Sequence, residues 1–428
     1  MRKLLLASAA TLLAGGAALA QPITQADPGK TSVYVQGFFT TGYGVYGDSG
    51  IAAAANKGNF KVNNNGMFGD IHIIPGFDGQ TLDGILYGAR IELRDAVYNA
   101  GKGKNNTTAN VVAGAETASA QGTGSMYVQR AYGYLGTKDY GFIRLGQADS
   151  AFTLSQVGVL EGFGDHEQFN CDNTGCAMMA NAPGAFIFAD SSSLYSTSKV
   201  VYVSPAVAAL GGNVSGMVGF EPNSNGIKEG YATVGSAYGA NANSIPGGSG
   251  TRRRNTIDVS ASYDNEVDGF ANKLSAAYLH GSPLGNTTGP QGYRALSVYQ
   301  VGAQTTYAGF TVGGNIKGGQ VLDGFAFTPK GGRSSFAYIV GATYNEGPYT
   351  VGASYFNQQS AGGWTQTGTA ARTLSEYGLA VGGDYRLAKP IDLYVQYGYG
   401  HKHQPGSSIS SSGNAQVQFV STGATLTW

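Results

Sequence analysis

The chain has 428 residues, and its 26 lysines and arginines balance 26 aspartates and glutamates, so the formal net charge is zero. That balance excludes the strongly basic surface of a nucleic-acid-binding protein. Charged residues make up only 12% of the chain, whereas glycine contributes 68 residues and tyrosine 27. Because glycine disfavours helices and tyrosine favours strands, this composition predicts many strands.

The first twenty residues have the pattern of an export signal. Arg2 and Lys3 precede the apolar run LLLASAATLLAGGAALA, which ends with small residues at Ala18 and Ala20. The run is short and rich in alanine, so residues 1–20 are predicted to be a signal peptide cleaved after Ala20, with a retained membrane anchor as the alternative. Without Arg2 and Lys3, the mature chain 21–428 keeps 24 basic residues beside 26 acidic ones. No linker divides it, so we predict one domain.

Alternating apolar and polar residues follow the signal to the end of the chain. In residues 85–94, ILYGARIELR, Ile85 and Ile91 share one face while Arg90, Glu92 and Arg94 share the other. No stretch approaches the roughly 18 apolar residues of a membrane helix. Strand-like segments lie near 32–46, 67–76, 83–97, 125–136, 141–149, 198–204, 212–221, 255–264, 271–281, 294–307, 310–319, 335–345, 349–358, 373–386, 391–401 and 415–428, which makes sixteen.

The connections between these segments alternate in length. Short ones, such as TKDYG at 137–141, NEGP at 345–348 and LAKP at 387–390, stand between long polar ones. Short periplasmic turns and long extracellular loops are typical of outer-membrane proteins. We therefore predict an all-β fold, a 16-stranded antiparallel transmembrane β-barrel. A soluble β-sandwich, such as a lectin or adhesin, is the alternative, and it would have short connections on both sides.

The chain ends in GATLTW, an alternation that places Leu426 and Trp428 on one face. We expect this last strand to pair with the first, which closes the barrel, and Trp428 to lie at the membrane interface. Other aromatic residues near strand ends predict interfacial girdles, and an aromatic sugar path inside the lumen is the alternative. The tyrosines concerned are Tyr34, Tyr46, Tyr263, Tyr307, Tyr349 and Tyr399.

Two segments carry a family resemblance. Residues 130–147, RAYGYLGTKDYGFIRLGQ, resemble a strand, tight turn and strand of the general trimeric porins of Gram-negative bacteria, and residues 199–205, KVVYVSP, resemble the strand after their third loop. The resemblance implies a homotrimeric channel in the outer membrane, in contact with lipid and lipopolysaccharide, for passive diffusion of small hydrophilic solutes and ions. It implies no cofactor and no enzymatic activity. A substrate-selective channel for sugars or phosphate is the alternative.

In that family the third loop folds into the barrel, and its acidic residues face basic residues on the opposite wall. The loop here would be residues 151–197, and it contains LEGFGDHE at 160–167. Alternation predicts that Gln129 faces the lumen and that Arg130 shares an outward face with Val128, Tyr132 and Tyr134. The candidates are Glu161, Asp165 and Glu167 for the acidic side, Arg90, Arg94 and Arg144 for the basic side, and Glu92, Gln129 and Lys199 for the remaining wall.

Three further expectations concern chemistry and assembly. Cys171 and Cys176 lie in the same loop, and in an oxidising compartment they are predicted to form a disulfide. The alternative, a metal site with His166, matches no zinc-ligand spacing, so no metal is predicted. The aromatic C-terminus, with Leu426 and Trp428, resembles the signal that the barrel assembly machinery reads. None of the five histidines has a recognisable catalytic setting.

Overall fold

A computed structural model describes residues 27–49, 64–96, 126–169, 197–223, 253–283, 293–321, 325, 327–328, 330–361, 373–403 and 414–428. Most of them are in strands. The strands are β1 (Thr31–Asp48), β2 (Asn65–Gln80), β3 (Leu86–Ala96), β4 (Tyr127–Thr137), β5 (Gly141–Gln147), β6 (Ser198–Val203), β7 (Val207–Ala209), β8 (Gly212–Asn223), β9 (Arg253–Val267), β10 (Phe270–Pro283), β11 (Leu296–Tyr307), β12 (Phe310–Gln320), β13 (Ser335–Glu346), β14 (Tyr349–Ala361), β15 (Thr373–Ala388), β16 (Ile391–His403) and β17 (Asn414–Thr427).

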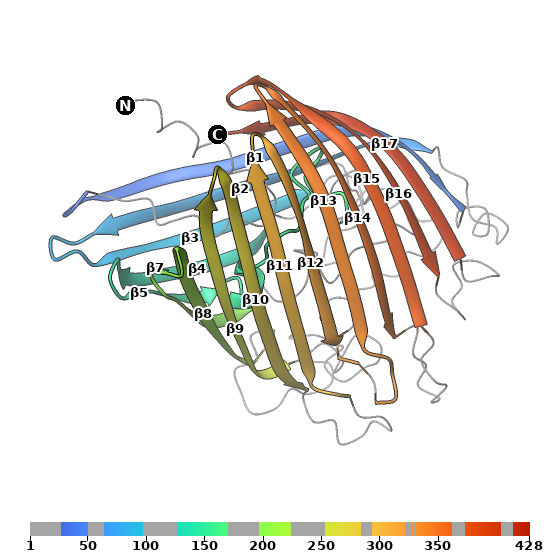
Figure 1. Ribbon diagram of the computed structural model, residues 1–428. Coiled ribbons are helices and arrows are strands. Elements are labelled where there is room, and N and C mark those ends of the chain that lie inside the picture. Colours follow the sequence, from blue (N-terminus) through green and yellow to red (C-terminus); the bar gives the residue numbers. More distant parts are fainter. Residues whose placement is uncertain are drawn as a thin grey trace.

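These strands form one closed antiparallel barrel (Figure 1). Except for β6 and β7, each strand pairs with its neighbours in the chain, and β1 pairs with both β2 and β17, so the sheet closes on itself. Both β6 and β7 pair with β8 and together occupy one position in the barrel, which therefore has sixteen positions. The predicted strand count and fold class are confirmed.

The interruption between β6 and β7 falls at Pro205, which has no N–H for a sheet hydrogen bond. Ser204 bridges the gap to β8. Its backbone N–H donates to Gly216 O at 2.9 Å, and its side-chain Oγ accepts from Gly216 N at 2.8 Å. A hydroxyl thus replaces a backbone acceptor, and the barrel stays closed where the strand breaks.

The connections follow the predicted alternation. Short turns join β4 to β5, β7 to β8, β9 to β10, β11 to β12, β13 to β14 and β15 to β16. The start of β1 and the end of β17 lie at the same end of the barrel as these turns (Figure 1). Among the described residues, no helix is long and apolar enough to span a membrane.

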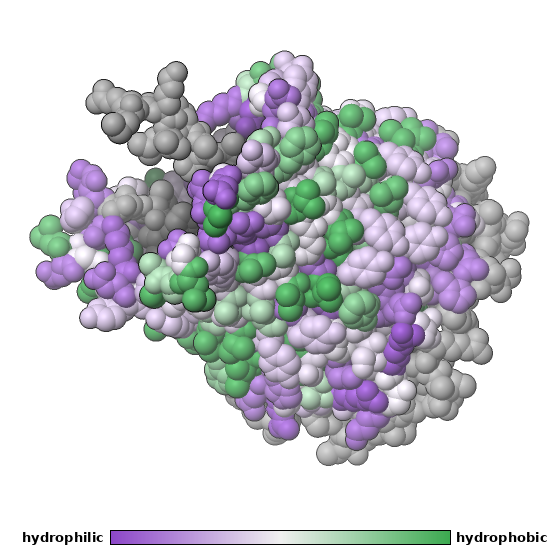
Figure 2. Space-filling model, in the orientation of Figure 1, coloured by the Kyte–Doolittle hydropathy of each residue, from purple (hydrophilic) through white to green (hydrophobic). Residues whose placement is uncertain are grey.

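The outer face of the barrel carries apolar residues with two bands of aromatic residues. Figure 2 shows apolar side chains over the strands and hydrophilic ones gathered toward the strand ends. Such bands are typical of the two membrane interfaces. The band at the turn end contains the ring pairs Phe270–Tyr307 and Phe310–Tyr344, both with centroids 4.2 Å apart, and Tyr349–Tyr385 at 5.2 Å; the other contains Tyr338–Tyr355 at 6.1 Å and Tyr377–Tyr399 at 6.3 Å.

Two of the predicted girdle tyrosines face the other way. Val33 and Val35 are exposed on the outer face of β1, so Tyr34 between them points inward, where its hydroxyl accepts a hydrogen bond from Arg90 Nε at 2.7 Å. Tyr46 is buried on the same inner face. The girdle prediction was therefore wrong for both, because position near a strand end does not determine which face a side chain takes.

The last residue takes part in closing the barrel. Leu426 pairs with Phe39 of β1, and beyond the strand Trp428 and Gly37 exchange backbone hydrogen bonds of 3.2 and 3.3 Å. The indole of Trp428 lies over Gly37, where a Cβ would be only 2.8 Å from ring atom Cε2. The predicted pairing of the C-terminus is confirmed, and glycine at position 37 makes room for the terminal ring.

A hydrophobic core lies inside the barrel, against the strands from β10 to β15. Its residues from the walls are packed against phenylalanines from the segments that follow β5 and β12. Because the side chains are buried, this part of the interior is closed to water. The core contains Phe152, Phe163, Phe169, Ala277, Leu279, Leu296, Val298, Val321, Phe325, Phe327, Ala337, Ile339, Phe356 and Ala380.

Candidate functional site

The segment after β5 runs into the barrel rather than away from it. Ser150 caps the short helix α2 (Ala151–Leu154) by accepting the Thr153 N–H at 3.1 Å. Phe152 N donates to Asp258 Oδ2 of β9 at 2.7 Å, and Phe152 O accepts from Gln300 Nε2 of β11 at 2.6 Å. Residues 150–169 are called the lumen segment below.

The lumen segment then follows the inner wall strand by strand. On β12, Asn315 Nδ2 donates to Val157 O at 2.7 Å. On β15, Asp384 Oδ2 accepts from Gly164 N at 3.1 Å, and on β16 Gln396 Oε1 accepts from Asp165 N at 3.1 Å. Side chains of the wall thus supply the backbone partners that an irregular segment needs when it lies inside a membrane protein.

Two of the acidic candidates stabilise the lumen segment itself. Glu161 Oε1 accepts a hydrogen bond from Phe169 N at 3.1 Å, and Asp165 Oδ1 accepts from Glu167 N at 3.2 Å. Asp165 is buried, whereas Glu161 and Glu167 are partly exposed. These contacts fix the turn at residues 161–169 close to β14, β15 and β16. Cys171 and Cys176 lie outside the described residues.

The basic candidates lie on another part of the wall. Arg90 and Arg94 of β3 and Arg144 of β5 are all buried on the inner face, while Ile91 and Leu145 are exposed outside. Alternation along the strands predicted these faces correctly. Arg90 Nη2 lies 3.6 Å from Asp78 Oδ2 of β2. Arginine side chains of this wall therefore face the interior beside carboxylates.

Glu92 is the centre of a buried ionic cluster. Its carboxylate pairs with Arg94 Nε on the same strand and with Arg130 Nη1 on β4. His72 of β2 lies 3.0 Å away through its Nδ1, and Asp149, which immediately precedes the lumen segment, lies 2.9 Å from Arg130 Nε. A chain of ion pairs and hydrogen bonds thus connects β2, β3 and β4 to the start of the lumen segment.

The inward direction of Arg130 corrects the predicted outward face. In the pairing of β3 with β4, Glu92 lies opposite Arg130 but Leu93 lies opposite Val128, so Gln129 is an extra residue, a β-bulge. A bulge shifts the alternation by one residue. Gln129 and Arg130 are both buried, as are Tyr132 and Tyr134, whereas Val128 is exposed. The alternation counted from Val128 therefore gave the wrong face for Arg130, Tyr132 and Tyr134.

Sequence reasoning missed Asp70, His72 and Asp149. Asp70 Oδ2 lies 2.5 Å from His72 Nε2, and the imidazole stacks on Phe38 with centroids 4.0 Å apart. The signal was present, because Asp70 and His72 alternate with Ile71 and Ile73 in the predicted strand 67–76. Asp149 could not be found in this way, since it follows the end of β5.

Lys199 secures both ends of the inserted loop. Its Nζ donates to Ala148 O at 2.8 Å and to Thr197 O at 3.1 Å, so one ammonium group holds the start and the end of the connection between β5 and β6. Glu221 of β8 lies 3.9 Å from this ammonium and 3.3 Å from Arg253 Nε of β9. The structure therefore places Lys199 at the base of the loop.

Arg144 differs from the other arginines of the wall. Its guanidinium lies over the rings of Tyr132 and Phe142, 5.3 and 5.5 Å from their centroids. In the part of the chain that the structure describes, no carboxylate forms an ion pair with it, and its buried Nη1 has no hydrogen-bond partner. Its positive charge is stabilised by cation–π contacts with the two rings.

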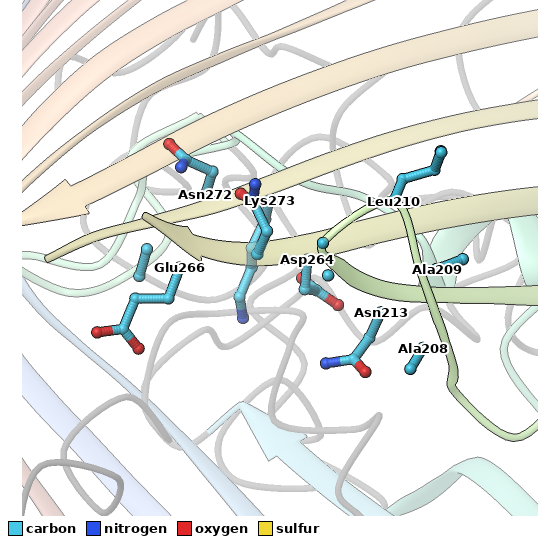
Figure 3. A pocket seen from close by; sticks show the side chains of 12 residues that line it. Ala208, Ala209, Leu210, Asn213, Asp264, Glu266, Asn272 and Lys273 are labelled. Atoms are coloured by element: carbon cyan, nitrogen blue, oxygen red, sulfur yellow. The ribbon is translucent and has the colours of Figure 1, made fainter. Parts of the chain in front are cut away.

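Other possible sites are limited. No group of three or more His, Cys, Asp or Glu residues that could hold a metal occurs among the described residues. A depression of about 670 Å³ opens at the turn end, between the β7–β8 and β9–β10 turns (Figure 3). Asn213, Asp264, Glu266 and Lys273 line it together with Ala208, Ala209 and Leu210. It is wide and open, without a buried group that would select a ligand.

A closed barrel of sixteen positions with an apolar outer face, two aromatic bands, a charged interior and an inserted segment defines an outer-membrane channel. Over residues 7–404 the chain matches the family model described as Gram-negative porin, and it belongs to that family. The family and the fold are those of channels rather than enzymes.

Solved structures share the fold. The anion-selective porin from Comamonas acidovorans is 14% identical with a TM-score of 0.54, and the match covers 93% of this chain and 100% of that one. A loop L8 deletion mutant of OmpT, an outer membrane protein of Vibrio cholerae, is 12% identical with a TM-score of 0.50, and the match covers 93% and 99%. No curated protein matches the chain by sequence.

Proposed function

We propose that this outer-membrane porin is a homotrimer in which each barrel passes small hydrophilic solutes and ions by passive diffusion, with the lumen segment as the constriction. The observation that carries the proposal is the course of the lumen segment. It is hydrogen-bonded along β9 to β16, while Arg90, Arg94, Arg130 and Arg144 lie on β3, β4 and β5. Carboxylates and guanidinium groups on different parts of a lumen orient water and dipolar solutes between them.

The inward-facing aromatic residues favour general diffusion over a sugar-selective path. Phe152, Phe163 and Phe169 of the lumen segment are at most 3% exposed, because they pack into the core against the wall. A sugar path needs ring faces open to the lumen. In the described part of the chain, these rings contact protein instead.

The distribution of aromatic pairs supports the trimer. Within the described residues, every aromatic ring pair on the outer face joins strands from β10 to β16. The outer face of β1 to β5 exposes mainly aliphatic residues, among them Val33, Ile91, Leu135 and Leu145, beside the aromatic Tyr43 and Phe77. Because aromatic bands mark the lipid interface, we assign β10–β16 to lipid and β1–β5 to the subunit contact.

Several further assignments belong to the same proposal. Residues 1–20 are cleaved as a signal peptide, and Cys171 and Cys176 form a disulfide. Leu426 and Trp428 are read by the barrel assembly machinery, lipopolysaccharide contacts the outer rim, and no catalytic activity accompanies transport. The exposed aromatic terminus of a fully paired last strand supports the assembly signal.

Planar-bilayer recording of the purified protein tests the proposal. We expect ohmic conductance steps that close in groups of three, from protein that resists SDS until it is boiled, because each barrel holds its own pore. Heat-denatured protein is the control. Folded protein that gives no steps would contradict an open channel, and steps that close singly would contradict the trimer.

A further inference from the structure

Five glycines form a continuous track on the inner wall beneath the lumen segment. They come from five successive strands, β11 to β15. The register places Gly313 opposite Gly341 and Gly352 opposite Gly382, whereas the steps from Gly302 to Gly313 and from Gly341 to Gly352 are diagonal, offset by two residues. The glycine track consists of Gly302, Gly313, Gly341, Gly352 and Gly382.

Each member of the track lies directly against the lumen segment. A Cβ at Gly302 would overlap the carbonyl oxygen of Val157, and one at Gly313 would lie 3.2 Å from Gly158 Cα. Toward the end of the track, a Cβ at Gly341 would lie 3.1 Å from Leu160 Cβ. The lumen segment thus occupies space that wall side chains would take, and at Gly313, Gly341 and Gly382 the backbone of the neighbouring strand also lies within 3.0 Å of an added Cβ.

The last two glycines hold the ring of Phe163. A Cβ at Gly352 would be 2.8 and 2.9 Å from ring atoms Cγ and Cε1, and one at Gly382 would be 3.1 Å from Cδ2. Phe163 is 0% exposed, so its ring is enclosed between the wall and the lumen segment. Wall side chains hold the backbone on either side, Asn315 at Val157 and Gln396 at Asp165.

We propose that the glycine track seats the lumen segment flush against the wall and thereby sets the cross-section of the pore. This inference rests on the proposed channel function and adds to it the residues that position the constriction. A side chain at Gly302 or Gly352, where the nearest atom belongs to the lumen segment, would push that segment toward the open side of the barrel. The pore would then narrow without any change in its charged residues.

The variant Gly352→Ala tests this position best, because the three atoms nearest to the added methyl all belong to the Phe163 ring. No barrel atom lies closer to the added methyl than these ring atoms, so the Phe163 ring, and with it the lumen segment, must move. We expect single-channel conductance to fall by about half, since conductance follows the narrowest cross-section. Phe163→Ala added to the same chain removes the clash and should restore most of the loss.

The matched control is Gly44→Ala on β1. Gly44 also faces inward and is buried, but its nearest neighbours lie 3.6 Å or more from a Cβ, so conductance should not change. A heat-modifiable Gly352→Ala protein with unchanged or higher conductance would overturn the inference. If that variant does not fold, Gly341→Ala gives a second test at milder contacts, because its added methyl would lie 3.1 Å from Leu160 Cβ and 3.0 Å from Ala353 O. Failure of both variants to fold would show that the track serves the barrel alone. Absence of conductance from folded wild-type protein would instead overturn the channel proposal.

Discussion

Glu92→Gln is expected to lower the free energy of unfolding by about 3–5 kcal/mol, the range found when one partner of a buried ion pair is removed. Glu92 is 2% exposed and contacts Arg94, Arg130 and His72 at once. The amide has nearly the same shape as the carboxylate, so packing is kept while the negative charge at the centre of the cluster is lost. Urea unfolding in phospholipid vesicles, followed by tryptophan fluorescence, measures the change.

The control for Glu92→Gln is Glu266→Gln, which makes the same chemical change at an exposed position near the β9–β10 turn. That substitution should shift the unfolding free energy by less than about 0.5 kcal/mol, as is usual for surface positions. Equal effects of the two substitutions would mean that the cluster around Glu92 contributes no stability. The cluster includes Asp149, which immediately precedes the lumen segment. A loss of stability in Glu92→Gln should therefore also increase the current noise of the open pore.

Deletion of Leu426, Thr427 and Trp428 is expected to abolish the folded barrel almost completely. The deletion removes the partners of Gly37, Phe38 and Phe39 on β1. Each backbone group left without a partner inside the bilayer costs several kcal/mol, and a barrel that is open at one edge has a whole row of them. The amount of SDS-resistant, heat-modifiable protein in outer membranes measures the outcome.

Trp428→Phe separates strand pairing from the identity of the terminal side chain. It keeps the backbone hydrogen bonds and a ring over Gly37, so we expect nearly normal amounts of folded protein. Assembly of the truncated chain at the wild-type level would show that closure does not depend on the last three residues.

The sequence allowed the barrel to be predicted, because alternation in a membrane strand is dictated by lipid on one side and water on the other. Residues 85–94 alone assigned Arg90, Glu92 and Arg94 to the interior, as found. Alternation fails where a strand contains an extra residue, and the bulge at Gln129 leaves no mark in a single sequence. Arg130 was therefore assigned to the wrong face.

The contacts of the lumen segment were beyond such reasoning. Asp165 meets Gln396, which is 231 positions away in the chain, and Gly158 meets Gln304, 146 positions away. Which inward-facing side chains lie beneath an inserted segment depends on barrel shape and strand tilt. For the same reason Gly352 and Gly382 were only turn-forming or small residues in the sequence, and their relation to Phe163 follows from the fold.

The core inside the barrel has a consequence for biogenesis. Parts of several strands are apolar on both faces, because a residue that faces lipid is followed by one that faces the core, as at Tyr278 and Leu279 on β10 and at Tyr355 and Phe356 on β14. Before the barrel closes, such stretches expose apolar side chains on both faces, and exposed apolar strands of this kind aggregate. Transit through the periplasm should therefore depend on a chaperone that covers the C-terminal half of the chain until it reaches the membrane.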